Sequence, residues 1–171
     1  MKNNLKKILV CVYSCEPGFS SEQEIGWKWA NLLSEFNDVH VLTRLSNKQT
    51  IENYIIKHKI VNNITFIYHD LPDWAKKWKK KERGLYLYYT LWQLGAYFKA
   101  RKINKKEKFN IVHYVTFGSL LLPNFMSLMP NKFILGPVGG GENTPLKFIG
   151  DFSLKGKITE IFRQTIQILQ L

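Results

Sequence analysis

A histidine and two hydroxyl residues lie close together in the segment VHYVTFGS. His113 lies in an apolar run, and Thr116 and Ser119 follow it. An imidazole at the end of a strand can hydrogen-bond a ligand hydroxyl or stabilise a developing charge. His113 is therefore the candidate catalytic residue, and the two hydroxyls are candidate ligand-binding groups. The alternative is a core histidine satisfied by the protein itself, the more common situation for a lone histidine in a strand.

Three successive glycines form a second candidate. Gly139, Gly140 and Gly141 precede the carboxylate of Glu142 in the segment GPVGGGENTP. Glycines let the backbone approach a ligand closely and adopt positive φ angles. A slack loop is the alternative, but the proline on either side of the glycines favours a fixed shape. We predict that these four residues line a binding site.

The loop SCEPGFSSEQEIGW is the third candidate, through Glu16 and Gly18. Ser21 and Glu24 have the spacing of a capping box, which predicts a helix starting there. The first turn of such a helix offers unpaired amides to a phosphate or a hydroxyl. The same pattern equally fits an ordinary capped loop.

Each of these segments borders a short apolar run, and such runs alternate with helical patterns. Strands are predicted over 7–14, 38–43, 64–69, 110–117 and 132–138, and helices over 21–36, 47–60, 83–106 and 154–171. This alternation predicts an α/β fold, a Rossmann-like parallel sheet flanked by helices. Loops at the carboxyl ends of such strands line one crevice. We therefore expect the loops after the first, fourth and fifth strands to converge there.

Apolar residues at helical spacing predict two of these helices. For the first helix they are Ile25, Trp29, Leu32, Leu33 and Phe36, and for the helix over 83–106 they are Leu87, Leu91, Leu94 and Phe98.

Several site types have no matching pattern in the sequence. The glycine fingerprint for dinucleotides, the phosphate-binding loop followed by lysine, and paired zinc ligands are all missing. Cys11 and Cys15 are the only two cysteines among 171 residues, which is too few for a disulfide framework and fits a reducing cytoplasm. We expect no metal and no cofactor, and no apolar run is long enough to span a membrane.

A basic and aromatic stretch begins after Pro72, in a chain of net charge +12. Interleaved rings and cations suit an anionic membrane surface. The candidate membrane-surface residues are Trp74, Lys76, Lys77, Trp78, Lys79, Lys80, Lys81 and Arg83. The alternative is that the rings fill the core while lysine stems cover its rim. Single-stranded nucleic acid would accept the same residues, but no RNA-binding motif accompanies them, so it is the least favoured partner.

Taken in order, these segments resemble the amino-terminal domain of family 4 glycosyltransferases. The resemblance rests on SCEPG…SE…GW, VHVLT, the D-W before a long helix, VHYVTFGS and GPVGGGE followed by proline, and it covers nearly the whole chain. It implies one half of a GT-B architecture, in which the first domain handles the acceptor and the second binds a nucleotide-sugar donor. It also implies metal-independent, retaining transfer of a hexose-type unit to a hydroxyl of a lipid-linked or polysaccharide acceptor, at the cytoplasmic face of a membrane.

Two departures from the family pattern limit what the resemblance implies. The paired-glutamate donor motif normally lies in the second domain, so we expect residues 1–171 to form a single acceptor-side domain that lacks the donor domain and is not competent alone. Many relatives carry a second histidine two positions after the strand histidine, where this chain has Val115.

Overall fold

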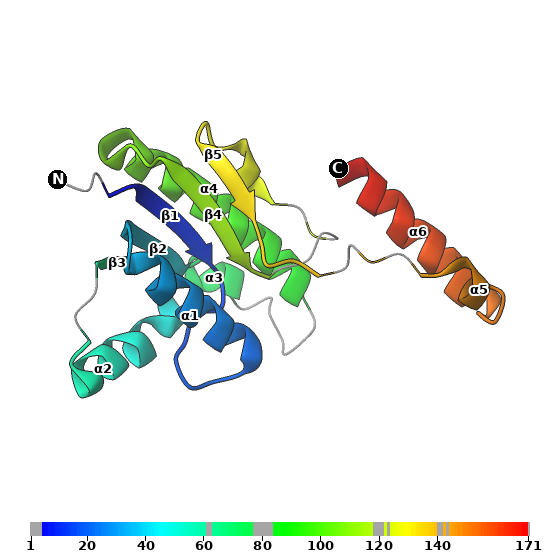
Figure 1. Cartoon of the computed structure of the whole chain (residues 1–171), viewed down its shortest axis with the longest axis horizontal. Helices are drawn as coiled ribbons and strands as arrows, with labels where there is room; N and C mark the ends of the chain where they lie inside the picture. Colours follow the sequence, from blue (N-terminus) through cyan, green and yellow to red (C-terminus); the bar gives the residue numbers. More distant parts are fainter. Residues whose placement is uncertain are drawn as a thin grey trace.

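Five parallel strands form one sheet in the order β3-β2-β1-β4-β5 (Figure 1). The computed structural model describes residues 5–60, 63–76, 84–117, 122, 124–139, 142 and 144–170. The strands are β1 (Lys7–Val12), β2 (Asp38–Arg44), β3 (Ile64–His69), β4 (Ile111–Thr116) and β5 (Lys132–Leu135). The predicted α/β class is confirmed, and each strand lies within or close to its predicted range.

Four long helices connect and follow the strands. They are α1 (Ser21–Ser34), α2 (Lys48–His58), α4 (Leu85–Glu107) and α6 (Leu154–Gln170). All four were predicted. The short helices α3 (Asp73–Lys76) and α5 (Leu146–Ile149) and the 3-10 turns η1 (Leu45–Asn47) and η2 (Phe125–Leu128) were not, because they are too short to show a periodic pattern.

Helices cover both faces of the sheet, and β1 shows how. Its residues alternate, so that Leu9 and Cys11 pack with side chains of α4, whereas Ile8, Val10 and Val12 pack with side chains of α1 and α2. A strand buried on both faces is apolar throughout, which is why the apolar runs located the strands.

The apolar residues whose spacing predicts α1 and α4 are only in part the residues that face the sheet. Leu32 of α1 and Leu87 and Phe98 of α4 are exposed, as is Phe36 just after α1, whereas Trp29 and Leu33 pack against the core. The faces that pack on the sheet are Gly26, Trp27, Ala30 and Ser34 in α1, and Tyr88, Tyr89, Trp92, Gln93, Ala96, Tyr97 and Ala100 in α4. Small residues let the helix backbone approach the sheet closely, and that close approach turns the leucines outward.

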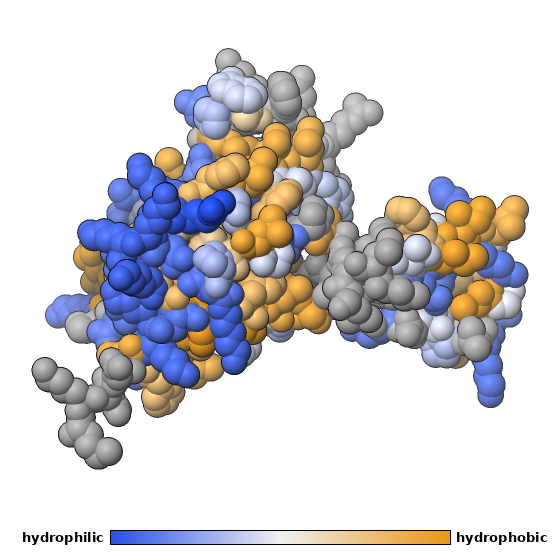
Figure 2. Space-filling model, turned by 90° about the horizontal axis from the view of Figure 1, so that it is seen from above, coloured by the Kyte–Doolittle hydropathy of each residue, from blue (hydrophilic) through white to orange (hydrophobic). Residues whose placement is uncertain are grey.

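Helices α5 and α6 lie to one side of the sheet (Figure 1). Apolar side chains are exposed along them, at the right of Figure 2: Phe148, Leu154, Ile158, Ile161 and Phe162. Within the described part of the chain, no helix is long and apolar enough to cross a membrane.

Candidate functional site at the carboxyl edge of the sheet

The carboxyl ends of β1 and β4 are joined by Thr116. Its Oγ1 accepts a hydrogen bond from the Ser14 amide at 3.0 Å and also lies 3.4 Å from the Ser14 carbonyl oxygen. The strand order reverses between these two parallel strands, because β2 and β3 follow β1 on one side of the sheet and β5 follows β4 on the other. This is the switch point at which open α/β sheets bind ligands. Thr116 is buried and hydrogen-bonded to the backbone of Ser14, so it supports this edge from inside the protein.

His113 lies in the middle of β4, paired with Val10 and Ile134, because the strand continues to Thr116. The expectation that it sits at the strand end is therefore wrong. Its Nε2 is 2.8 Å from the Gly136 carbonyl oxygen, and its ring meets that of Trp29 edge-on. Since a carbonyl only accepts, Nε2 carries the hydrogen, which leaves Nδ1 as the acceptor of the neutral ring. His113 thus fixes the backbone that leads from β5 to the glycines.

Stability is expected to fall as the solution is acidified through about pH 6.5, the ordinary pKa of histidine. Burial lowers the pKa of both His113 and His69. The unfolded chain therefore takes up protons on these rings before the folded chain does, which favours unfolding at low pH. Urea denaturation between pH 8 and pH 5 measures the slope.

The His113→Gln variant keeps a side-chain donor and is expected to show a shallower pH slope. His58→Gln is the control, because His58 is exposed on α2. Identical slopes for wild type and His113→Gln would contradict a buried, neutral His113.

The β1–α1 loop is held by the first turn of α1. Glu24 accepts a hydrogen bond from the Gly18 amide at 2.6 Å, and the Glu16 carboxylate accepts one from the Gln23 side chain. Gly18 has φ +75°, a conformation that favours glycine. The capping box forms one residue earlier than predicted: Oε1 of Gln23 accepts from the amide of Ser20 at 3.3 Å. Glu24 is engaged by Gly18 instead, which explains the shift.

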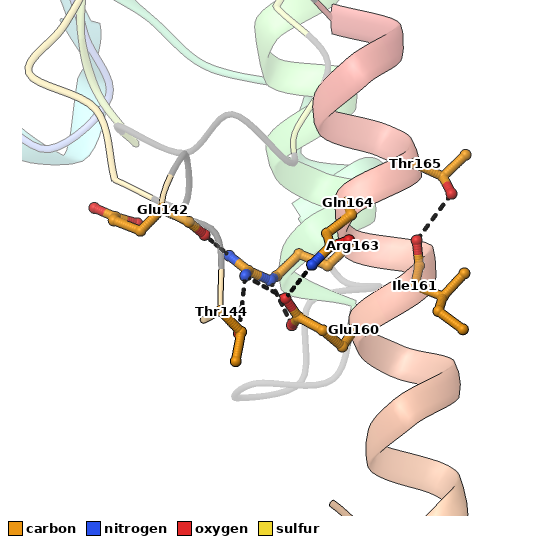
Figure 3. Close-up of polar contacts among 7 residues, drawn as sticks. All are labelled: Glu142, Thr144, Glu160, Ile161, Arg163, Gln164 and Thr165. Atoms are coloured by element: carbon orange, nitrogen blue, oxygen red, sulfur yellow. Dashed lines mark hydrogen bonds and ion pairs between the residues drawn. The ribbon is translucent and has the colours of Figure 1, made fainter. Parts of the chain in front are cut away.

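Two residues that follow the glycines, Glu142 and Thr144, are bound by α6 through Arg163 (Figure 3). Nη1 of Arg163 donates to the Glu142 carbonyl oxygen at 2.6 Å, and Nη2 donates to Oγ1 of Thr144 at 3.3 Å. Both Nη2 and Nε also donate to the Glu160 carboxylate, at 2.6 and 2.9 Å. Arg163 lowers the pKa of Glu160 to about 2. One guanidinium therefore joins α6 to the segment that follows the glycines.

Replacing Arg163 with methionine is expected to release residues 142–144 without unfolding the sheet. The change removes the two hydrogen bonds that Arg163 donates to Glu142 and Thr144. Hydrogen exchange should rise in peptides covering 142–150 and stay unchanged in β1 and β4. Arg101→Met is the matched control, because Arg101 contacts only Tyr97 of its own helix in the described residues. Unchanged exchange at 142–150 would show that Arg163 does not anchor the segment.

The remaining predicted site residues are placed as follows. Gly139 and Glu142 are exposed, whereas Ser119, Gly140 and Gly141 lie outside the described residues. Trp74 is exposed in α3 and Lys76 ends that helix. The other predicted membrane-surface residues, Lys77, Trp78, Lys79, Lys80, Lys81 and Arg83, also lie outside the described residues.

A polar cluster at the same edge was not predicted. Tyr13 follows β1, Arg44 ends β2, Asp70 follows β3, and Glu22 lies in the first turn of α1. Nε of Arg44 donates to the Tyr13 carbonyl oxygen at 3.0 Å, and its guanidinium lies over the Tyr13 ring, 4.4 Å from the centroid. Burial raises the pKa of Glu22, and the charge of Arg44 opposes that effect. Arg44 and Asp70 directly follow two predicted strands, and that position is the signal that could have found them.

In the part of the chain that the structure describes, no group of three or more histidine, cysteine or acidic side chains could hold a metal ion. No family model matches the sequence, and no curated protein matches it.

Proposed function

We propose that this chain is the acceptor-side domain of a GT-B sugar-transferring enzyme that moves a hexose-type unit from a nucleotide sugar to a hydroxyl acceptor. The observation that carries the proposal is the all-parallel sheet with β1 beside β4, whose exit segments contact one another at one edge. The order of the motifs SCEPG, VHYVTFGS and GPVGGGE along the chain supports it.

In this proposal the residues at the carboxyl edge position the acceptor. Gly139, Glu142 and Gly18 are exposed and Glu16 is half-buried, so a ligand can reach them. His113 acts as a positioning residue, because its imidazole holds the Gly136 carbonyl and so sets the path of the glycine segment. Such preorganisation contributes by fixing reactants and by placing dipoles where charge develops.

The division of labour between domains is tested by titration calorimetry of this chain with nucleotide sugars. We expect no tight complex, because the donor is assigned to another domain. A complex in the micromolar range would contradict that assignment.

The reaction itself is tested on native protein recovered from its host with an antibody raised against this chain. With a radiolabelled nucleotide sugar, the recovered protein is expected to release nucleotide and to label a hydroxyl acceptor. Failure to release nucleotide from every donor in a broad panel would contradict sugar transfer.

A second candidate function is docking to an anionic membrane, and α6 favours it. Leu154, Ile158 and Phe162 form an exposed apolar stripe on this helix. Lys155 is also exposed there, and Lys157 is half-buried. Apolar residues beside lysines are typical of helices that lie in a membrane interface.

Flotation with vesicles that contain an anionic phospholipid tests this second function. Phe162→Glu is expected to reduce vesicle binding by about tenfold or more, because burying one large apolar side chain contributes roughly 1.5–3 kcal/mol. Ile56→Glu is the control, because Ile56 is 75% exposed on α2. If both variants bound vesicles as well as the wild type does, α6 would not be part of the membrane-binding surface.

A further inference from the structure

Arg44 and Glu22 are two charged side chains whose hydrogen-bonding capacity is largely unused. Arg44 is fixed at Nε by the Tyr13 carbonyl, which also accepts a hydrogen bond from Nδ2 of Asn47 at 3.2 Å. Among the described residues, neither carboxylate oxygen of Glu22 has a hydrogen-bond or ion-pair partner. The Arg44 guanidinium, bonded through Nε, also acts on the Tyr13 hydroxyl and opposes the rise of its pKa that burial causes. Arg44 and Glu22 are both half-buried. Unpaired charged groups are costly when partly desolvated, so this arrangement is suited to a ligand.

The buried hydroxyl of Tyr13 is a second unused polar group at the same place. Tyr13 is 2% exposed, and its OH has no hydrogen-bond partner among the described residues. Its ring is held by edge-on contacts with Tyr89 and Trp92, at centroid distances of 5.1 and 5.0 Å. Arg44 therefore rests on a rigid aromatic base. A guanidinium held in this way is preorganised for two parallel hydrogen bonds.

The surrounding charges select the kind of ligand. Asp70 lies at the same edge, where its carboxylate accepts a hydrogen bond from the Tyr88 hydroxyl. Burial and the charges of Asp70 and Glu22 raise the pKa of Tyr13, and the charge of Arg44 acts on Glu22 as well as on Tyr13. The Glu22 carboxylate disfavours a phosphate at this place. Neighbouring hydroxyls of a neutral sugar can instead accept from Arg44 and donate to Glu22.

We propose that Arg44 and Glu22 form a hydroxyl-binding subsite for an uncharged sugar unit, at the carboxyl edge of β1 and β2. This inference rests on the proposed function, because it names the acceptor unit handled at that edge. The subsite lies on the β1–β2 side of the crevice, whereas the glycine segment lies on the β4–β5 side.

Saturation-transfer NMR with methyl pyranosides and neutral disaccharides tests the subsite on the whole chain. We expect millimolar binding of at least one neutral sugar. Glu22→Gln and Arg44→Lys should each weaken that binding by about tenfold, because both replace a hydrogen bond to a charged group. Glu35→Gln, at the far end of α1, and Arg101→Lys, which also lies over a tyrosine ring, are the matched controls and should bind as wild type does.

Each result either supports or overturns the subsite. Absence of binding by every neutral sugar, or full binding by both variants, would overturn it, as would tighter binding of a sugar phosphate that depends on Arg44. Glu22→Gln loses no hydrogen bond to any residue that the structure describes, so it tests the site even if Arg44→Lys fails to fold. Variant-sensitive sugar binding without transfer by the native protein would retain the subsite and reject the proposed function. Sugar transfer with an acceptor KM that neither variant changes would retain the proposed function and reject the subsite.

Discussion

The Gly26→Ala variant is expected to be less stable than the wild type by roughly 3 kcal/mol or more. A Cβ atom at Gly26 would lie 2.1 Å from the Ser14 carbonyl oxygen and 2.4 Å from Cγ1 of Val12. The first of these atoms belongs to the backbone at the end of β1, which cannot move without disturbing the bond between Ser14 and Thr116. The gain in helix propensity, about 1 kcal/mol, does not offset this clash.

Urea denaturation followed by tryptophan fluorescence measures this loss. Gly156→Ala is the control, because Gly156 lies inside α6 and its nearest neighbour, Cβ of Phe152, is 3.2 Å away. We expect that control to change stability by less than about 1 kcal/mol. A Gly26→Ala variant as stable as Gly156→Ala would show that α1 does not approach β1 as closely as described.

The Trp92→Ala variant is expected to lose about 3–5 kcal/mol of unfolding free energy. Trp92 is fully buried, its Nε1 donates to the His69 carbonyl oxygen at 3.0 Å, and its ring supports Tyr13. Removing it leaves a cavity under the carboxyl edge and frees the Tyr13 ring on which Arg44 rests. Weaker binding of neutral sugars should therefore accompany the loss of stability.

Phe98→Ala is the matched control for Trp92→Ala. Phe98 lies on the same helix but is 61% exposed, so its truncation is expected to cost less than about 1 kcal/mol. Denaturation at 25 °C compares the two variants. Equal losses would mean that Trp92 is not the centre of the α4 packing.

The strands could be predicted because a doubly covered parallel sheet demands apolar residues at nearly every position. The burial of α1 and α4 could not, because both helices carry apolar residues on more than one face. Periodicity then selects the leucines, whereas packing selects the glycine, alanines and aromatic rings that fit against β1. The close approach at Gly26 decides the rotation of α1, and a sequence pattern does not reveal that distance.

The candidate site was predictable in its location and less so in its contacts. Loops after β1, β4 and β5 had to meet once the strand order was known. The pairs that join them, Ser14 with Thr116 and His113 with Gly136, are 102 and 23 residues apart in the chain. A short sequence pattern cannot indicate contacts between residues that are so far apart in the chain. Arg44 and Glu22 were missed because neither belongs to a recognisable motif, although each lies directly at the end of a strand or the start of a helix.

The contact made by Arg163 couples two segments that lie at the edge of the molecule. Its guanidinium donates hydrogen bonds to the Glu142 carbonyl and the Thr144 hydroxyl. Its charge is neutralised by the carboxylate of Glu160 on its own helix. A displacement of α6 would break its hydrogen bonds to Glu142 and Thr144, so a surface that binds the apolar stripe of α6 would also bear on the residues that follow the glycines.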